Sequence, residues 1–341
     1  MKKVIALLFI VFILSSFFLD AGGTAASVVR GIETCLYIII PALFGFMAVS
    51  SYLIQSGLYR LLFKPLFLIF RLIIRLSEEE FGIFLLSLFG GYPVGAKLIS
   101  DKPQYKNLLP YCYCPSPGFV ISLAGLGIFA NPRAGLAVYL SNFFTCVFIA
   151  VILNFKNPVK KSERNLRFNI TQDVFTSSVI SSARALFPVC VLIISFGVII
   201  QTLKFYGIER ILSLFGENAP AFFFSAVEIT NAGGLPADLS LLPIYAALFS
   251  FGGLCITLQV PALLKNKALL KKFFLWRIPA ALLSAGICRL LMLFFNLEQA
   301  VAASASPHGE IIPLEAGNPI ASVTLFIMAV ILIKSFREKQ Y

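Results

Sequence analysis

The chain has 341 residues, of which 59% are hydrophobic and 13% are charged, and its mean hydropathy is +0.90. A soluble domain carries about 25% charged residues, so this composition excludes an ordinary soluble protein and indicates a chain dissolved in lipid. The formal net charge of +12 does not indicate nucleic-acid binding, because the basic residues stand at the ends of apolar segments, as topology signals do.

Cysteine and histidine usage restricts the chemistry. The seven cysteines are odd in number and nearly all lie inside apolar stretches, which is not the pattern of a disulfide framework. The single histidine, His308, stands in a polar loop, so Ser/His or Cys/His nucleophile systems are not expected. Cys112 and Cys114 are close in sequence, but no histidine or second cysteine pair accompanies them as a zinc site requires. We therefore predict neither an enzyme, nor a metal site, nor a cofactor.

The N-terminal segment, residues 1–27, has two readings. Lys2 and Lys3 precede an apolar run over residues 4–19, and the small residues 25–27 are typical of a signal-peptidase site. We favour an uncleaved first membrane helix over a cleaved signal peptide.

The rest of the chain contains apolar stretches suited to a hydrocarbon core, which takes roughly 20 helical residues to cross. In chain order the predicted spans are residues 32–54, 107–130, 133–155, 174–203, 240–263, 273–296 and 319–333. Between the first two of these, residues 60–75 carry their basic side chains on one helical face, which predicts an amphipathic helix in the inner interface.

Basic residues orient these spans. When alternate loops are assigned to the cytoplasm, most Lys and Arg residues lie there, and the opposite side keeps only Arg30, Arg133, Lys204 and Arg210. Residues 298–318 contain glutamates but no Lys or Arg, as an external loop can. The prediction is a multi-pass protein of the cell (cytoplasmic) membrane with both termini in the cytoplasm.

Two stretches share one order of elements. Residues 32–155 and 174–296 each run from a long apolar helix through a short amphipathic segment and an apolar hairpin with a glycine-proline break to two further spans. The first begins outside and the second inside, which is the inverted repeat of many secondary transporters. The predicted parts are an N-terminal membrane helix (1–27), a first repeat (28–155), a basic cytoplasmic linker (156–173), a second repeat (174–297), an external loop (298–318) and a C-terminal membrane helix with a basic tail (319–341).

The predicted fold class is an all-α polytopic membrane protein of about eight transmembrane helices in two inverted repeats, each with a re-entrant hairpin and a broken helix. In the first half, residues 90–97 (Gly-Gly-Tyr-Pro-Val-Gly-Ala-Lys) should end the helix that precedes them. They are not a phosphate-binding loop, because Ala96 separates Gly95 from Lys97 and no soluble strand precedes them. Backbone opened at membrane depth must face protein or a wet cavity, so we expect this hairpin tip to face an internal site.

In the second half the corresponding hairpin, residues 221–239, carries polar groups at its break. Glu228 is the most informative, because a carboxylate inside an apolar segment costs about 2.5 to 3.5 kcal/mol on insertion scales and is by default a functional hypothesis. It is predicted to bind the substrate or a coupling cation, sodium or a proton. The alternative is a structural partner between helices, with Arg289 as the candidate.

The next span of each half is also interrupted, at residues 114–118 and 250–253. Carbonyls and helix ends freed at such breaks coordinate ions and polar substrates. We expect Thr257 to face the same cavity. The predicted substrate-binding residues are Gly90, Gly91, Tyr92, Pro93, Gly95, Ser116, Gly118, Glu228, Thr230, Asn231, Gly233, Gly234, Ser250, Gly252, Gly253 and Gln259.

In combination, these motifs resemble one family. The segments at 90–97, 114–118 (Cys-Pro-Ser-Pro-Gly), 228–231 (Glu-Ile-Thr-Asn) and 250–260 (Ser-Phe-Gly-Gly-Leu-Cys-Ile-Thr-Leu-Gln-Val) are similar to the YlbJ-type sporulation integral membrane proteins. The resemblance covers roughly residues 32–295. That family looks like part of a wider set with a nucleoside recognition or Gate domain, found also in concentrative nucleoside transporters and ferrous-iron permeases.

The chain departs from the family pattern at two places. Residues 114–118 stand where Cys-Asn-Thr-Ser-Gly-Pro is expected, and Thr257 stands where histidine is expected. The resemblance implies a bacterial membrane protein of spore formers and the location of a site, but no substrate. We expect a secondary permease for a small polar solute. The alternative is a non-transporting membrane scaffold or assembly factor in spore envelope formation. The expected partners are that solute and the lipid bilayer, with no nucleic acid, and the pattern is compatible with a homo-oligomer.

Overall fold

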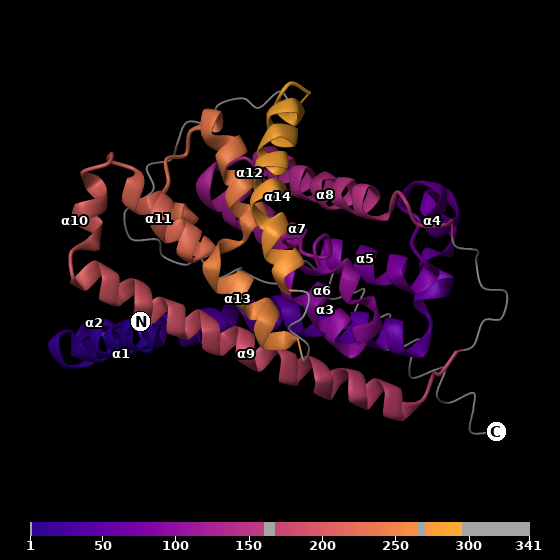
Figure 1. Cartoon of the computed structure of the whole chain (residues 1–341), viewed down its shortest axis with the longest axis horizontal. Coiled ribbons are helices and arrows are strands. Elements are labelled where there is room, and N and C mark those ends of the chain that lie inside the picture. The colour runs from indigo at the N-terminus through magenta and orange to yellow at the C-terminus, as the bar shows by residue number, and fades with distance from the viewer. Residues whose placement is uncertain (1, 160–167, 265–269, 295–341) are drawn as a thin grey trace. The chain divides into compact units, whose positions relative to one another are not determined.

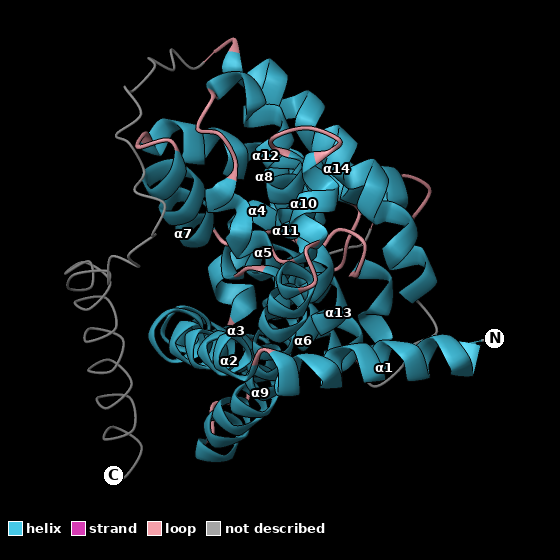
Figure 2. Ribbon diagram, turned by 90° about the vertical axis from the view of Figure 1, so that its left-hand side faces the viewer, coloured by secondary structure: helices cyan, strands magenta, loops and turns pink. Residues whose placement is uncertain are grey.

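The computed structural model describes residues 2–159, 168–264 and 270–294. All of them belong to one of the two units into which the chain divides, residues 1–303, and the description concerns that unit. The described residues form helices and no strand, which confirms the all-α class (Figures 1 and 2). In chain order the elements are α1 (Lys2–Leu19), α2 (Ala21–Thr34), the π-helix η1 (Cys35–Ile39), α3 (Ile40–Ser56), α4 (Tyr59–Ile74), α5 (Glu78–Gly90), α6 (Tyr92–Asp101), the 3-10 helix η2 (Pro103–Leu108), α7 (Pro117–Val120), the π-helix η3 (Ile121–Ile128), α8 (Pro132–Asn154), α9 (Gln172–Phe205), α10 (Ile208–Ser213), α11 (Ala219–Val227), the 3-10 helices η4 (Ile229–Gly234) and η5 (Leu239–Leu241), α12 (Leu242–Phe251), α13 (Gly253–Leu263) and α14 (Leu270–Met292).

The helices of the described part indicate an integral membrane protein. Five helical segments are long and apolar enough to cross a membrane, and they coincide with five of the predicted spans. The predicted C-terminal span, residues 319–333, lies outside the described residues, and the inverted relation of the two halves stays a prediction. The five segments are Ala21–Ser56, Pro132–Asn154, Gln172–Phe205, Leu239–Leu263 and Leu270–Met292.

The long helix α9 packs along α2 and α3 (Figure 1). Polar groups pin α9 to the N-terminal helices. Asp20 caps α2 by accepting from the Gly23 amide at 3.1 Å, and it also accepts from Gln201 Nε2 on α9 at 2.8 Å. The buried Ser16 and Thr202 hydroxyls lie 2.9 Å apart. Because each polar side chain finds a partner on another helix, these contacts fit an apolar surrounding without orphaned groups.

The amphipathic segment forms α4 as predicted, although Pro65 lies inside the helix. The next helix, α5, begins at a capping box in which Ser77 and Glu80 satisfy each other's backbone amides. It ends at Gly91, whose φ of +91° turns the chain back. The helix therefore ends within residues 90–97, as predicted, and helix α6 begins at once at Tyr92, with Pro93 in its first turn where a missing amide is tolerated.

The predicted span 107–130 is wrong in its extent. Residues 109–116 are not helical, and only Pro117–Ile128 forms a helix, as α7 followed by the π-helical turn η3. Pro110, Pro115 and Pro117 remove three backbone donors from this stretch, so the interruption predicted at residues 114–118 begins earlier than expected.

The second hairpin is also less regular than predicted. Its entering arm is the helix α11, which ends at Glu228, but its return arm is only the 3-10 helix η4 followed by extended chain. Gly233, Gly234 and Pro236 disfavour an α-helix here.

Three helices meet at one carbonyl. Asn142 of α8 and Ser284 of α14 both donate to the carbonyl oxygen of Ala246 on α12, at 3.3 and 3.2 Å. Small or polar buried residues at four-residue spacing line α14, namely Ala280, Ser284 and Cys288. Small residues let helix backbones approach closely in a membrane, which accounts for this packing.

Candidate functional site

The tip of the first hairpin lies against the first helix break. A methyl group on Gly91 would come 3.3 Å from Cβ of Ser116, and the Ser116 hydroxyl itself caps α7 by accepting from the Phe119 amide at 3.4 Å. The structure therefore brings together Gly91 and Ser116, which lie in two separately predicted motifs.

Side chains from the first half satisfy the carbonyls of the second break. Helix α12 ends at Gly252, whose φ is +80°, so the last carbonyls of α12 have no intrahelical partner. The Tyr92 hydroxyl donates to the Phe249 carbonyl, and the Tyr113 hydroxyl donates to the Phe251 carbonyl at 3.1 Å. The two breaks are thus held by one set of hydrogen bonds.

Thr257 takes part in the same set. Its hydroxyl donates to the carbonyls of Gly253 at 2.7 Å and Phe251 at 3.2 Å, and it lies 3.3 Å from the Tyr113 hydroxyl. Thr257 stands where the family pattern expects histidine. Its hydroxyl therefore forms hydrogen bonds with backbone carbonyls at the second break.

The second hairpin tip reaches the same break from another direction. Gly253 has φ +73°, and a methyl group on it would come 3.2 Å from the Ile229 amide nitrogen and 3.3 Å from the Val227 carbonyl oxygen. Because these residues flank Glu228, the backbone at Glu228 lies beside the Gly252–Gly253 break. That this junction is a binding site stays a prediction.

Glu228 is only 6% exposed. Its Oε1 accepts from the amide and the hydroxyl of Thr230, both at 3.4 Å, and the Cys255 thiol lies beside the carboxylate and interacts with it. Oε2 has no hydrogen-bond partner of ordinary geometry among the described residues. Asn231 supports the turn by donating to the Glu228 carbonyl at 3.1 Å. The predicted alternative partner is wrong, since Arg289 is exposed on α14 and forms no ion pair with Glu228. A buried carboxylate with one free oxygen is costly unless a ligand or proton binds it.

The other predicted residues divide into two groups. Ser250, Gln259 and Pro93 are buried near the breaks, and Gln259 donates to the Cys255 sulfur at 3.8 Å. Gly90 packs against Phe46. Their roles in binding stay predictions. Gly95 is also buried and lies against the Cys112 carbonyl. The second group is exposed and consists of Gly118, Thr230, Gly233 and Gly234.

Arg277 was not among the site residues predicted from the sequence. This residue of α14 is 2% exposed, and its guanidinium carbon lies 4.4 Å from the ring centroid of Tyr113 and 4.7 Å from that of Phe273. Nη2 donates to the Pro110 carbonyl, and Nε has no partner among the described residues. A desolvated cation–π contact contributes about 2 kcal/mol, less than the several kcal/mol that burial of an ion costs. A buried charge in a membrane-spanning helix is a functional hypothesis, as it is for Glu228.

A second buried cation, Lys97 of α6, is paired. It is 2% exposed and its Nζ lies 2.7 Å from Asp101 Oδ2, which also accepts from the Ser51 hydroxyl at 3.1 Å. Gln55 donates to Ser51 at 2.8 Å and accepts from Ser177 of α9 at 3.1 Å. This polar chain ties the first hairpin to α3 and α9.

The open end of the first hairpin is closed by a polar cluster outside the apolar segments. Glu79 of α5 accepts from the Tyr105 hydroxyl at 2.8 Å and lies 2.9 Å from Lys102 Nζ. Burial, together with the hydrogen bond to the Glu79 carboxylate, raises the pKa of Tyr105 well above its usual value, so the phenol stays protonated at neutral pH.

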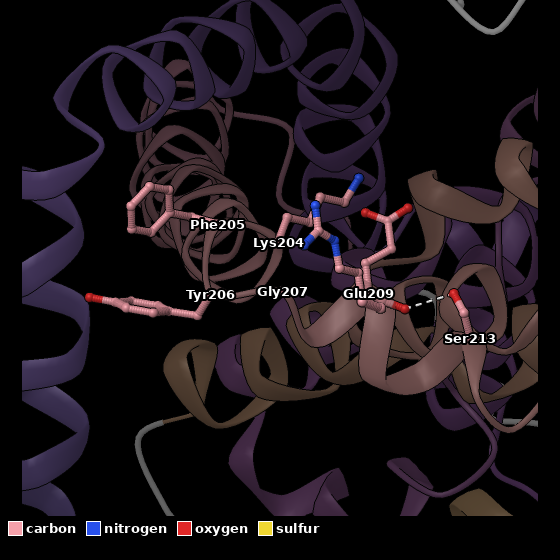
Figure 3. Close-up of a pocket in the computed structure, with 7 residues that line it drawn as sticks. Lys204, Phe205, Tyr206, Gly207, Glu209 and Ser213 are labelled. Atoms are coloured by element: carbon pink, nitrogen blue, oxygen red, sulfur yellow. Dashed lines mark hydrogen bonds between the residues drawn. The ribbon is translucent and has the colours of Figure 1, made fainter.

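A surface pocket of about 650 Å³ lies elsewhere, at the turn between α9 and α10 (Figure 3). Lys204, Phe205, Tyr206, Gly207, Glu209, Arg210 and Ser213 line it. The Ser213 hydroxyl donates to the Glu209 carbonyl at 2.8 Å, which completes the helical turn (Figure 3). None of the predicted site residues lines this pocket, so it is separate from the junction of the breaks.

Comparisons of the chain with protein-family models, curated proteins and solved structures give no match. The junction of the two breaks and the sequence motifs are therefore the features that bear on function.

Proposed function

We propose that this protein is a secondary permease that moves a small polar solute across a bacterial cytoplasmic membrane, driven by sodium or protons that bind at Glu228. The observation that carries the proposal is the junction itself. Two hairpin tips and two helix breaks, from segments far apart in sequence, meet beside a buried carboxylate that has one free oxygen.

The physical case begins with the breaks. Irregular backbone at membrane depth is tolerated where protein or a wet cavity satisfies it, and in transporters unwound carbonyls coordinate the coupling ion. Here the carbonyl oxygens of Ala226 and Val227 would lie 3.5 and 3.3 Å from a methyl group on Gly253, next to Glu228. A monovalent cation or a proton at Glu228 offsets the free-energy cost of the buried carboxylate, and this favours binding of the ion.

The motif resemblance adds the context. On its basis the proposal includes a role in spore formers, a Gate-like architecture of inverted repeats and about eight membrane helices.

Thermal unfolding of the detergent-purified full chain tests it, with nucleosides, amino acids, small carboxylates and monovalent cations as probes. A ligand present at one hundred times its Kd stabilises the folded state by about 2.7 kcal/mol. We expect at least one probe to stabilise the wild-type protein, and we expect the Glu228→Gln variant to lose this stabilisation. Glu217→Gln, at an exposed glutamate outside the breaks, is the matched control and should leave the response unchanged.

Uptake into reconstituted vesicles is the second test. Any solute that stabilises the protein should accumulate when a sodium or proton gradient is imposed. Undiminished uptake after simultaneous replacement of Glu228 and Asn231 by alanine would refute the assigned site. No stabilisation by any probe would favour the membrane scaffold instead.

A further inference from the structure

The proposed permease leaves one buried charge without a role. Arg277 is 2% exposed, and none of the ion pairs among residues 2–159, 168–264 and 270–294 includes it. By contrast, the other fully buried cation, Lys97, has its carboxylate partner at 2.7 Å. A buried guanidinium that has no counter-charge among these residues is an unusual feature in an apolar surrounding, and it is a candidate site for an anionic ligand.

The hydrogen bonds of Arg277 leave donors of the guanidinium unused. Nη2 donates to the Pro110 carbonyl, which uses one of its two hydrogens, and Nε has no partner among the described residues. Nη2 and Nε are neighbouring donor atoms in the guanidinium plane. Two parallel donors of this kind match the two oxygens of a carboxylate, which a neutral solute does not offer.

Arg277 also lies at the junction. Its guanidinium lies over the ring of Tyr113, whose hydroxyl donates to the Phe251 carbonyl at the second break. A methyl group on Gly252 would come 2.3 Å from that hydroxyl, so ring and break are in direct contact. Both Arg277 and Glu228 interact electrostatically with the Tyr113 hydroxyl, so the two charges share one neighbour.

We propose that the solute carries a carboxylate group that binds Arg277, so that the substrate class is small organic carboxylates. This inference rests on the proposed permease. It also gives the two buried charges a common purpose, because a cation at Glu228 and a carboxylate at Arg277 leave the loaded protein with no unneutralised charge at the junction.

The only tryptophan of the chain, Trp276, precedes Arg277 and is half-buried, so its fluorescence reports on binding there. Titration of the detergent-purified full chain with pyruvate, succinate, glutamate, inorganic phosphate, uridine and choline, read by this fluorescence and by thermal stability, tests the assignment. We expect saturable responses to carboxylates and none to uridine or choline.

Variants at position 277 sharpen the test. Arg277→Gln should abolish the response to carboxylates, and Arg277→Lys, which keeps the charge but loses the paired donors, should raise their Kd at least ten-fold. Arg289→Gln, at the exposed arginine of the same helix, should leave Kd unchanged. If Arg277→Gln does not fold, the lysine variant decides, and an unchanged Kd in it overturns the assignment.

The other outcomes separate this inference from the permease. Stabilisation by uridine, retained in Arg277→Gln or Arg277→Lys, refutes the carboxylate and leaves the permease standing. Binding of phosphate but of no carboxylate also refutes it. No response to any probe or cation refutes both.

Discussion

Replacing Gly95 with alanine tests how closely the first hairpin packs against the chain before the first break. Gly95 lies in α6, where alanine gains about 1 kcal/mol over glycine by helix propensity. However, the added methyl group would come 2.1 Å from the Cys112 carbonyl oxygen and 3.0 Å from Cβ of Ser87. Since the nearest atom belongs to backbone, no side-chain rotation can relieve the clash.

Overpacking of a well-packed interior costs about 1–3 kcal/mol, and rigid backbone places this site near 3 kcal/mol. Subtracting the helix propensity gives a net loss of about 2 kcal/mol. With about 2 °C per kcal/mol for a large domain, the apparent melting temperature should fall by roughly 4 °C.

The assay is thermal unfolding of detergent-purified protein, with Gly286→Ala as the matched control. Gly286 lies in α14 and has no atom within 4 Å of its Cβ position, so this variant should gain about 1 kcal/mol. A Gly95→Ala protein that melts at or above the wild type would refute the reasoning, because α6 could not then contact the Cys112 segment as closely as described.

Substitutions at three further places, namely the Lys97–Asp101 pair, the second break and the start of α5, are measured by the same thermal assay. Asp101→Asn should cost about 3 kcal/mol, because it removes the carboxylate that pairs with the buried Lys97. Lys97→Met should cost less, since the Asp101 side chain that it leaves unpaired is 23% exposed, and the reverse order would contradict the pairing. Gly252→Ala should lose at least about 1–2 kcal/mol from its left-handed backbone and more from the contact with Tyr113, and a neutral result would contradict that geometry. Ser77→Ala should cost about 1 kcal/mol by removing the capping box, and Ser77→Thr should retain most of it.

Hydropathy predicted the long helices well because a membrane span is decided by local composition. The boundaries predicted for the spans at 133–155 and 174–203 fall within a few residues of α8 and α9. Glycines in the sequence also predicted the helix breaks, and Gly91 and Gly252 have the positive φ expected there. Both signals depend only on residues adjacent in sequence.

Features that depend on tertiary contacts could not be predicted from the sequence. The stretch before Pro117 is apolar enough to resemble a span, yet it is held as irregular chain by contacts such as that between Pro110 and Arg277. Arg277 itself follows Lys271 and Lys272 closely, so it resembles one more interfacial cation, and only packing against Tyr113 reveals its burial. By contrast, Glu228 has no basic neighbours in sequence, so the sequence alone was enough to predict that it is buried in an apolar segment.

The hydrogen bonds across the junction also have a consequence for the order of synthesis. Tyr92 and the Phe249 carbonyl that it satisfies are 157 residues apart, and Tyr113 and Phe251 are 138 apart. At about 5–20 residues per second, the ribosome makes the acceptor roughly 7–30 s after the donor. During that interval the hydroxyls of Tyr92 and Tyr113 lack these two acceptors, so closure of the junction must follow translation of the second half.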